Sequence, residues 1–371
     1  MKKIIIAVLL LSALALVGCS GGAKKEYSVE EYRTTMKYYD DFKVMQLADL
    51  HLGIETDVAR QLDIIKNAIR TERPDLVVLT GDNFMYGTKG IVNALVSALN
   101  EVCAELTAAR DGRLTKFTVT FGNHDNQGDY PRYYINDVLL SYATEDGREI
   151  EDGKFAAFRD FEDDALFGLT NFYIDLVDDR EKSREEADVK YRLHIIDSNT
   201  YHFVGPGYGY DVMHEEQLAH AAKVYESATA DRSYIGMAFF HIPFFEYEDV
   251  RQGYIEASGS VLGQGDFFEG ISYAYENNGS YEKLRDANIV AFFCGHDHIN
   301  CGDFIYDVGG ERSIFSYGVK STNQLYHKEN MIGYKTVLLK DISLEEFLSE
   351  ENIKQSFKNE RGGYSAYEND R

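Results

Sequence analysis

The chain has 371 residues and a formal net charge of −24 at pH 7, with 44% hydrophobic and 27% charged residues. This balance is typical of a globular protein with a substantial core and excludes a disordered chain. The negative charge argues against a nucleic-acid partner, because nucleic-acid-binding surfaces neutralise phosphates with basic stripes. A small phosphorylated substrate stays compatible with it, since bound cations can reverse the local field.

The first residues have the pattern of an export signal. Two lysines precede an apolar run over residues 4–17, which as a helix is about 21 Å long against the roughly 30 Å of a bilayer core. The run ends before Gly18 and Cys19 and resembles the lipobox of bacterial lipoproteins, whose cysteine becomes the lipidated first residue. We therefore expect a signal peptide over residues 1–18 and a mature protein held by lipid on Cys19, at the outer face of the cytoplasmic membrane or at the outer membrane. The alternative is an ordinary secretory signal with an incidental cysteine.

Composition divides the rest of the chain into three parts. Residues 19–40 begin with a Ser/Gly-rich stretch and are predicted to be a tether. One domain is expected over residues 41–345, with an acidic, irregular insertion at about 140–190 that forms either a lid or a solvated elaboration. Residues 346–371 are predicted to be a polar, poorly ordered tail. With so few cysteines the protein is not a disulfide scaffold, although Cys294 and Cys301 could pair instead of staying buried thiols.

Hydrophobic patterns predict strands that alternate with helices along this domain. Apolar runs predict strands over residues 43–48, 76–80, 117–121, 191–197, 234–240 and 289–294. Further strands, expected at sheet edges, cover residues 304–308, 313–317 and 333–339, and the insertion has a strand near 171–176. Helices are predicted over residues 56–71, 91–110 and 215–227. This order indicates a sheet with helices packed on its face.

Polar side chains follow five of the predicted strands, at the point where each strand ends. They are Asp49 and His51, Asp82, Asn123 and His124, His241, and His296 and His298. The carboxyl ends of parallel neighbours meet at one edge of a sheet, which is where such proteins bind their ligands. Each short motif is weak evidence alone, but five at five strand ends predict one site. Carboxylate, amide and imidazole groups without a thiolate favour manganese, iron or zinc over copper or calcium.

These motifs resemble the five sequence blocks of the calcineurin-like metallophosphoesterase superfamily. The blocks are Asp49-x-His51, Gly81-Asp82-Asn83, Gly122-Asn123-His124-Asp125, His241 and Gly295-His296-x-His298. The surrounding sequence is more similar to the purple-acid-phosphatase-like enzymes of bacteria and fungi than to the protein serine/threonine phosphatases. The resemblance implies an α/β fold, a four-layer α-β-β-α sandwich of two mixed sheets, and a centre with two divalent metal ions.

The resemblance also implies a role for each residue. Asp49, His51 and His298 would hold one metal ion, and Asn123, His241 and His296 would hold the other. Asp82 would bridge the two ions, which would activate a bridging hydroxide to attack a phosphate ester.

Other residues of the same blocks have less certain roles. His124 is not needed as a ligand and becomes the candidate general acid for the leaving oxygen. Asp125 would either orient that imidazole or brace the loop. True purple acid phosphatases carry a tyrosine three residues after the bridging aspartate, where this chain has Met85, with Tyr86 following. The resemblance therefore does not imply a ferric site.

Weaker candidates for substrate binding lie near these motifs. Phe244 and Tyr247 closely follow the predicted ligand His241, and Arg251 and Lys320 are cations that could steady a phosphate oxygen. An aromatic loop over residues 201–210 could wall the substrate pocket or simply pack on the surface.

The sequence thus predicts an exported, lipid-anchored dinuclear metallophosphoesterase that acts on a small phosphorylated substrate. Phosphomonoesters are favoured, and phosphodiesters or nucleotides are alternatives at the same site. A non-catalytic surface lipoprotein that binds a ligand is the alternative from another class. Nothing in the motifs identifies the substrate.

Overall fold

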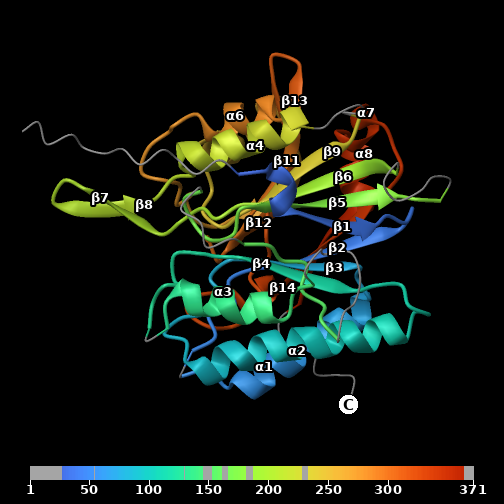
Figure 1. The fold of residues 1–371 in the computed structure, drawn as a ribbon. Helices are drawn as coiled ribbons and strands as arrows, with labels where there is room; N and C mark the ends of the chain where they lie inside the picture. Colours follow the sequence, from blue (N-terminus) through green and yellow to red (C-terminus); the bar gives the residue numbers. More distant parts are fainter. Residues whose placement is uncertain are drawn as a thin grey trace, which may run out of the picture.

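Two facing β-sheets with helices on both outer faces make up the protein (Figure 1). The computed structural model describes residues 27–362 apart from 54, 129, 145–152, 161–165, 181–186 and 228–232. The arrangement confirms the predicted four-layer sandwich of mixed sheets. The predicted signal peptide and Cys19 lie outside the described residues, so export and lipid attachment stay predictions.

The smaller sheet has five strands in the order β15-β14-β2-β3-β4. Its parallel part consists of β2 (Phe42–Leu47), β3 (Leu76–Thr80) and β4 (Lys116–Thr120). Two antiparallel neighbours extend it, β14 (Gly333–Leu339) and β15 (Phe357–Arg361). Its outer face is covered by α1 (Val58–Glu72), α2 (Lys89–Ala108) and α3 (Arg132–Ser141). Within the described residues, α2 is the one helix long and apolar enough to cross a membrane, but it buries its apolar face here as a core helix.

The larger sheet has eight strands in the order β1-β5-β6-β9-β11-β13-β12-β10. The strands are β1 (Arg33–Lys37), β5 (Phe172–Asp178), β6 (Asp188–Ile195), β9 (Ile235–Phe239), β10 (Val261–Phe267), β11 (Ile289–Cys294), β12 (Asn300–Val308) and β13 (Glu311–Tyr317). Helices on its outer side are α4 (Glu215–Ser227), α5 (Glu246–Ile255) and α6 (Ser280–Asp286). A separate hairpin of β7 (Tyr201–Val204) and β8 (Gly207–Tyr210) projects from one end of the sandwich (Figure 1).

Alternate side chains of the central strands pack into two apolar layers. Met237, Phe239 and Phe293 belong to the cluster that includes the residues of the smaller sheet. Their neighbours Phe240 and Phe292 belong to a second cluster beneath the helices of the larger sheet. Burying a side chain of this size contributes about 1.5–3 kcal/mol. The central strands are therefore held on both faces, and the loops at their carboxyl ends start from rigid positions.

Both terminal segments extend further into the fold than predicted. Within the predicted tether, residues 19–40, β1 pairs in parallel with β5 and buries Thr34 and Met36. Within the predicted tail, residues 346–371, α8 (Glu350–Ser356) and β15 are regular, and Phe357 is 1% exposed. Both predictions were wrong for these stretches. A few apolar side chains in a polar background are enough to order a segment when it can pair with an open edge strand of a sheet.

The remaining boundary predictions also need correction. The predicted insertion, residues 140–190, contains β5, which lies between β1 and β6 in the larger sheet and is part of the core. The three strands expected at sheet edges are interior, because β10 and β15 cover them. The three cysteines of the described residues, Cys103, Cys294 and Cys301, are buried free thiols.

Candidate metal centre

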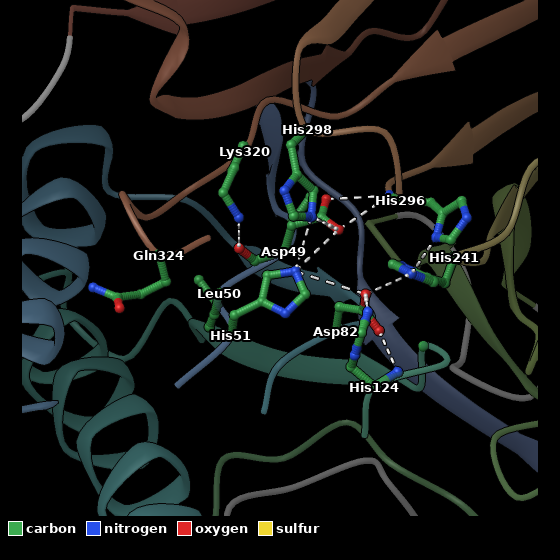
Figure 2. Close-up of polar contacts among 12 residues, drawn as sticks. Asp49, Leu50, His51, Asp82, His124, His241, His296, His298, Lys320 and Gln324 are labelled. Carbon is green, nitrogen blue, oxygen red and sulfur yellow. Dashed lines mark hydrogen bonds and ion pairs between the residues drawn. The ribbon is translucent and has the colours of Figure 1, made fainter. Parts of the chain in front are cut away.

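Loops from both sheets meet at one end of the sandwich. Three of them follow β2, β3 and β4 of the smaller sheet, and two follow β9 and β11 of the larger one. Figure 2 shows that their side chains point toward one another. The structure brings together all seven predicted ligands, each at most 6% exposed: Asp49, His51, Asp82, Asn123, His241, His296 and His298. Among them, Nδ1 of His51, Oδ1 of Asn123 and Nε2 of His296 are buried without a hydrogen-bond partner. Two carboxylates and four imidazoles buried this close together indicate a site built for a cation.

The first group consists of Asp49, His51 and His298, whose ligand atoms lie within 4.8 Å of one another. Nε2 of His51 is 2.9 Å from Nε2 of His298, and Oδ1 of Asp49 is 3.8 Å from the same His298 nitrogen. Two ligand atoms bound at about 2.1 Å to one ion lie roughly 3 Å apart at a right angle. The spacing therefore suits a single small cation.

The second group consists of Asp82, His241 and His296. Nε2 of His241 lies 3.1 Å from Nδ1 of His296 and 3.2 Å from Oδ2 of Asp82. Asn123, the fourth ligand predicted for this group, has a ligand atom available, because its Nδ2 donates to the Tyr201 hydroxyl at 2.8 Å while its buried Oδ1 has no hydrogen-bond partner. An unpaired buried acceptor costs about 1–3 kcal/mol, which a cation would offset.

Asp82 lies between the two groups. Its Oδ2 is 3.2 Å from His241 in one group and 3.7 Å from His51 in the other. Burial opposes ionisation, but His241 and His51 together hold the pKa of this carboxyl well below its usual range. The side chain is therefore an ionised carboxylate in the position of a bridging ligand.

Most of the imidazoles are in the form that binds metals. Burial lowers the pKa of His51 and His296 and brings that of His298 to about 3, so these rings are neutral at pH 7. Nδ1–H of His298 donates to the Tyr326 carbonyl at 2.9 Å, which turns its Nε2 lone pair toward the first group.

His241 differs from the other rings in its protonation. Burial lowers its pKa, but the carboxylates of Asp82 and Asp49 outweigh burial and raise it to about 9. Nδ1–H donates to the Thr80 carbonyl at 2.9 Å, so the second proton sits on Nε2 beside Asp82. A metal ion at this group therefore has to displace a proton.

Backbone strain is concentrated at the ligands. Four of them have left-handed φ angles: Asp49 (56°), His51 (46°), Asp82 (50°) and His296 (84°). Such residues cost about 1–3 kcal/mol each and occur mainly where function requires them. Gly81 is required beside them, because its φ is 84° and an added Cβ would lie 2.6 Å from the His241 side chain.

Three consecutive side chains, residues 320–322, support the strained loop after β2 from behind. Lys320 Nζ donates to the Asp49 carbonyl at 2.9 Å, Thr322 Oγ1 donates to the Leu50 carbonyl at 2.8 Å, and Ser321 Oγ accepts from the Ala48 N–H at 3.1 Å. Lys320 is 2% exposed, so it cannot contact a substrate. Its prediction as a substrate-binding residue was wrong, and it belongs to this bracing segment.

His124 stands at the rim, outside both metal groups. Its side chain is 24% exposed, and its Nε2 is 4.0 Å from Oδ2 of Asp82. Its Nδ1 lies 2.9 Å from the side-chain oxygen of Gln127, and its N–H donates to Oδ1 of Asp82 at 2.8 Å. An oriented imidazole that is not a ligand has the placement expected of a proton donor.

Asp125 has the second of the two roles predicted for it, because it braces the loop and does not orient His124. It accepts hydrogen bonds from the N–H groups of Phe84 and Gly122, both at 2.8 Å, and from Asn83 Nδ2 at 3.1 Å. These contacts join the loops after β3 and β4, whereas Gln127 orients His124. Gln127 was missed because a glutamine three residues after a histidine carries no pattern of its own.

Three predicted substrate-binding residues are elsewhere in the fold. Phe244 and Tyr247 pack in the cluster beneath the helices, and the Tyr247 hydroxyl donates to the Phe292 carbonyl at 2.9 Å. Arg251 pairs with Glu248 on the same helix at 2.9 Å. These predictions were wrong because the chain turns away from the centre directly after His241 and continues as α5.

The aromatic loop over residues 201–210 forms the β7–β8 hairpin, and only its base contacts the centre. Tyr201 holds the Asn123 amide, and the ring of Tyr210 stands edge-on to His296 with 4.3 Å between centroids. At the tip, Phe203 is 86% exposed. The hairpin thus contributes residues that orient ligands, a role that its aromatic composition did not predict.

The geometry agrees with what comparison with known proteins shows. The sequence model of the calcineurin-like phosphoesterase family matches residues 42–300, more than half of the chain. The chain belongs to this family. Membership and the two candidate metal groups together support a metal-dependent phosphoesterase.

Individual relatives are distant. Phosphatase DCR2 of Saccharomyces cerevisiae is 28% identical over 284 residues, covering 70% of this chain and 44% of the yeast protein, so this chain spans less than half of that relative. Probable inactive purple acid phosphatase 29 of Arabidopsis thaliana is 23% identical over 290 residues, covering 71% of this chain and 69% of the plant protein. Among solved structures, a dimetal phosphatase from Danio rerio has a TM-score of 0.41 and 14% identity, covering 82% of this chain and 94% of its own.

Proposed function

We propose that this protein is a phosphomonoesterase that uses two divalent metal ions. The observation that carries the proposal is the pair of buried ligand groups that share Asp82, with the imidazole of His124 free at their rim. The relatives named above as phosphatases support the choice of a phosphate ester as substrate. One of them is named as probably inactive, but here every predicted ligand and His124 are present, and the carboxylates and imidazoles point toward one another (Figure 2).

The residues of the site have separate roles in the proposed reaction, either as metal ligands or as the proton donor. Asp49, His51 and His298 would hold one ion, and the other would be held by Asn123, His241 and His296, with Asp82 shared. Manganese, iron or zinc suits this donor set, which lacks a thiolate. When bound, two such ions lower the pKa of coordinated water and neutralise charge on phosphate oxygens. His124 then protonates the leaving oxygen, with Gln127 fixing the direction of its ring.

The test is a comparison of esters and metals. Metal-free protein is supplied with manganese, zinc or iron and assayed with p-nitrophenyl phosphate and bis(p-nitrophenyl) phosphate. We expect turnover of the monoester to exceed that of the diester, and loss of turnover in Asp82→Asn. His327→Ala serves as a matched control, since this histidine lies outside both groups. A preference for the diester would make the protein a phosphodiesterase, and no turnover of either ester with any of the metals would contradict the proposal.

We also propose that the protein is exported and lipid-anchored through Cys19. The support is the sequence pattern of two lysines, an apolar run over residues 4–17 and the cysteine that follows. Mass spectrometry of the protein purified from membranes should find a mature chain that starts at an acylated Cys19. Cys19→Ser should move the protein out of the membrane fraction, and an unmodified Cys19 in the membrane-bound protein would reject lipidation.

A further inference from the structure

A pocket of about 200 Å³ opens beside the first metal group. Of the residues that line it, only His51 is a candidate metal ligand. It is lined by His51, Gly53, Glu55, Thr56, Met85, Tyr86, Gln324 and Leu325. We propose that this pocket binds the leaving group of the substrate, and that this group is a compact, uncharged alcohol with an apolar, ring-like surface. The inference rests on the proposed phosphoesterase function and names the substrate class of that site.

The position of the pocket fits a leaving group. His51 belongs both to the first metal group and to the pocket wall, and its ring stands edge-on to the proton donor His124, with 5.2 Å between centroids. The loop after His124 also packs on the opposite wall, since a Cβ added at Gly128 would meet Cα of Tyr86 at 3.1 Å. An alcohol protonated by His124 therefore leaves next to this pocket.

The floor and one side of the pocket are rigid. The loops after β2 and β3 are joined by hydrogen bonds from Met85 N–H to the Leu52 carbonyl at 3.1 Å and from Leu52 N–H to the Asn83 carbonyl at 3.0 Å. Gly53 permits this approach, because an added Cβ would lie 2.2 Å from the Met85 carbonyl oxygen. Pre-formed walls of this kind are usual for small-molecule sites.

The far side of the pocket is linked to the same floor. The Thr56 hydroxyl donates to Oε1 of Gln324 at 3.4 Å, which ties the loop after β2 to the segment that follows the bracing residues. Tyr86 and Leu325 hold left-handed φ angles of 54° and 60°. Neither side chain favours this conformation, and strain of this kind is kept mainly at functional sites.

The lining indicates the chemical class of the leaving group. Tyr86 is 55% exposed and Leu325 is 42% exposed, so two large apolar side chains face solvent across the pocket and would gain by covering a ring. The lining residues include no lysine or arginine, whereas Glu55 contributes a carboxylate. A second phosphate or carboxylate on the leaving group would therefore meet repulsion without a compensating cation.

The size of the pocket limits the leaving group further. Sites for drug-sized ligands have volumes of about 300–1,000 Å³. A pocket of about 200 Å³ has room for one substituted ring. An aryl phosphate is therefore the expected type of substrate, ahead of pyrophosphate or a sugar bisphosphate.

The experiment compares two phosphate esters and a phosphoric anhydride, which transfer the same phosphoryl group and differ in the leaving group. The manganese-loaded enzyme is assayed with p-nitrophenyl phosphate, methyl phosphate and pyrophosphate. For the aryl ester we expect Tyr86→Ala and Leu325→Ala to lower kcat/KM about tenfold, mainly through KM, because each removes apolar contact. For methyl phosphate, which does not reach the pocket, kcat/KM should stay within about twofold. Tyr133→Ala is the matched control, as this tyrosine is 67% exposed on α3 and outside the pocket.

Glu55→Gln tests the charge of the pocket separately. It should raise kcat/KM for pyrophosphate several-fold and change that for p-nitrophenyl phosphate much less. The leaving phosphate of pyrophosphate is already charged when the substrate binds, whereas the nitrophenyl group gains charge only as its bond to the phosphate breaks. The wild-type enzyme gives a reading that does not depend on any variant, since it should prefer the aryl ester to pyrophosphate.

The outcomes separate the two proposals. If the wild type hydrolyses phosphate esters but treats pyrophosphate as well as the aryl ester, or if the pocket variants change all esters equally, the leaving-group pocket is refuted and the phosphoesterase stands. If no ester is hydrolysed with any metal, the proposed function fails, and the inference fails with it.

Discussion

At the residue scale, the centre depends on which atom each side chain turns inward. Tyr201 holds the Asn123 amide nitrogen and leaves the buried amide oxygen without a partner, and Nε2 of His298 faces the first group because its Nδ1–H is bound to the Tyr326 carbonyl. Supporting contacts of this kind commonly change metal affinity by 10–100-fold when removed. These contacts therefore determine which atom of each side chain is available to a metal ion.

His124 provides the sharpest prediction at this scale. His124→Ala should keep both metal ions, because its ring belongs to neither group, and should lose turnover by about 10²–10⁴. Elemental analysis and steady-state kinetics on the same preparation measure both quantities. Gln127→Ala should give a smaller loss, since it only frees the ring to rotate. A His124→Ala protein without metal would show that the imidazole is a ligand instead.

The protonation of His241 predicts how metal binding depends on pH. In the metal-free protein the pKa of His241 is about 9, because burial lowers it but the facing carboxylates of Asp82 and Asp49 raise it more. The neutral ring of His296 lies beside it. Each ion bound at the second group then releases one proton below this pH. Its apparent affinity should rise about tenfold per pH unit from pH 7 to 9 and level off above 9.

The same proton also affects the metal-free fold, with the opposite sign. Because the folded pKa of His241 exceeds the unfolded value of about 6.5, its contribution to stability is complete below pH 6.5 and is lost as the pH rises through 9.

The prediction on metal affinity is measured by calorimetry. Titrations with zinc in buffers of different ionisation enthalpy count the protons that metal binding releases. An affinity that does not change between pH 7 and 9 would place the proton elsewhere.

At the element scale, the loop after β2 is strained and is held from behind by residues 320–322. Asp49 and His51 both have positive φ, and the carbonyls of Asp49 and Leu50 are bound by Lys320 and Thr322. The bracing segment follows β13 of the larger sheet, whereas the loop belongs to the smaller one. The ligand geometry of the first group thus depends on how the two sheets face each other.

Thr322→Val tests this brace without changing charge or volume. It leaves the buried Leu50 carbonyl unpaired, which should cost about 1–3 kcal/mol of folding free energy and weaken metal binding at the first group. Urea denaturation and a metal titration measure the two effects. Thr71→Val is the control, because that threonine makes a similar bond on the exposed surface of α1. Equal stabilities for the two variants would mean that the segment does not brace the loop.

Local patterns were enough to predict the central elements and most of the site. Apolar runs located β2, β3, β9 and β11 to within two residues, and motif spacing identified the seven ligands that the structure gathers. The same patterns did not predict β15. This strand forms by pairing with β14, and the local sequence does not show that contact. Tyr201, Gln127 and Thr322 were missed for the same reason, since each acts on a residue that the fold alone brings near.

At the scale of the whole molecule, the metal centre joins the two sheets. The loops after β2, β3 and β4 supply Asp49, His51, Asp82 and Asn123, and those after β9 and β11 supply His241, His296 and His298. Ions bound by both sets would stabilise the sandwich as well as serve the proposed reaction. A net charge of −24 attracts cations to the protein, and this buried group of carboxylates and imidazoles has the donor atoms to bind them.

Metal removal should therefore lower the thermal stability. A ligand present at 100 times its Kd stabilises the folded state by about 2.7 kcal/mol, so a chelator should lower Tm by several degrees. Differential scanning calorimetry with and without chelator measures the shift. Asp82→Asn should show a smaller shift, since it loses the carboxylate common to both groups. An unchanged Tm in the wild type would argue against ions that tie the sheets together.

We propose that two ions, which share Asp82 as a ligand, make this chain a phosphoesterase. Titration of the metal-free protein with manganese, with bound ions and turnover of p-nitrophenyl phosphate measured on the same samples, tests it most directly. Turnover should appear as the second ion binds and reach its maximum at two ions per chain. Full turnover at one ion per chain, or turnover without any bound ion, would contradict it.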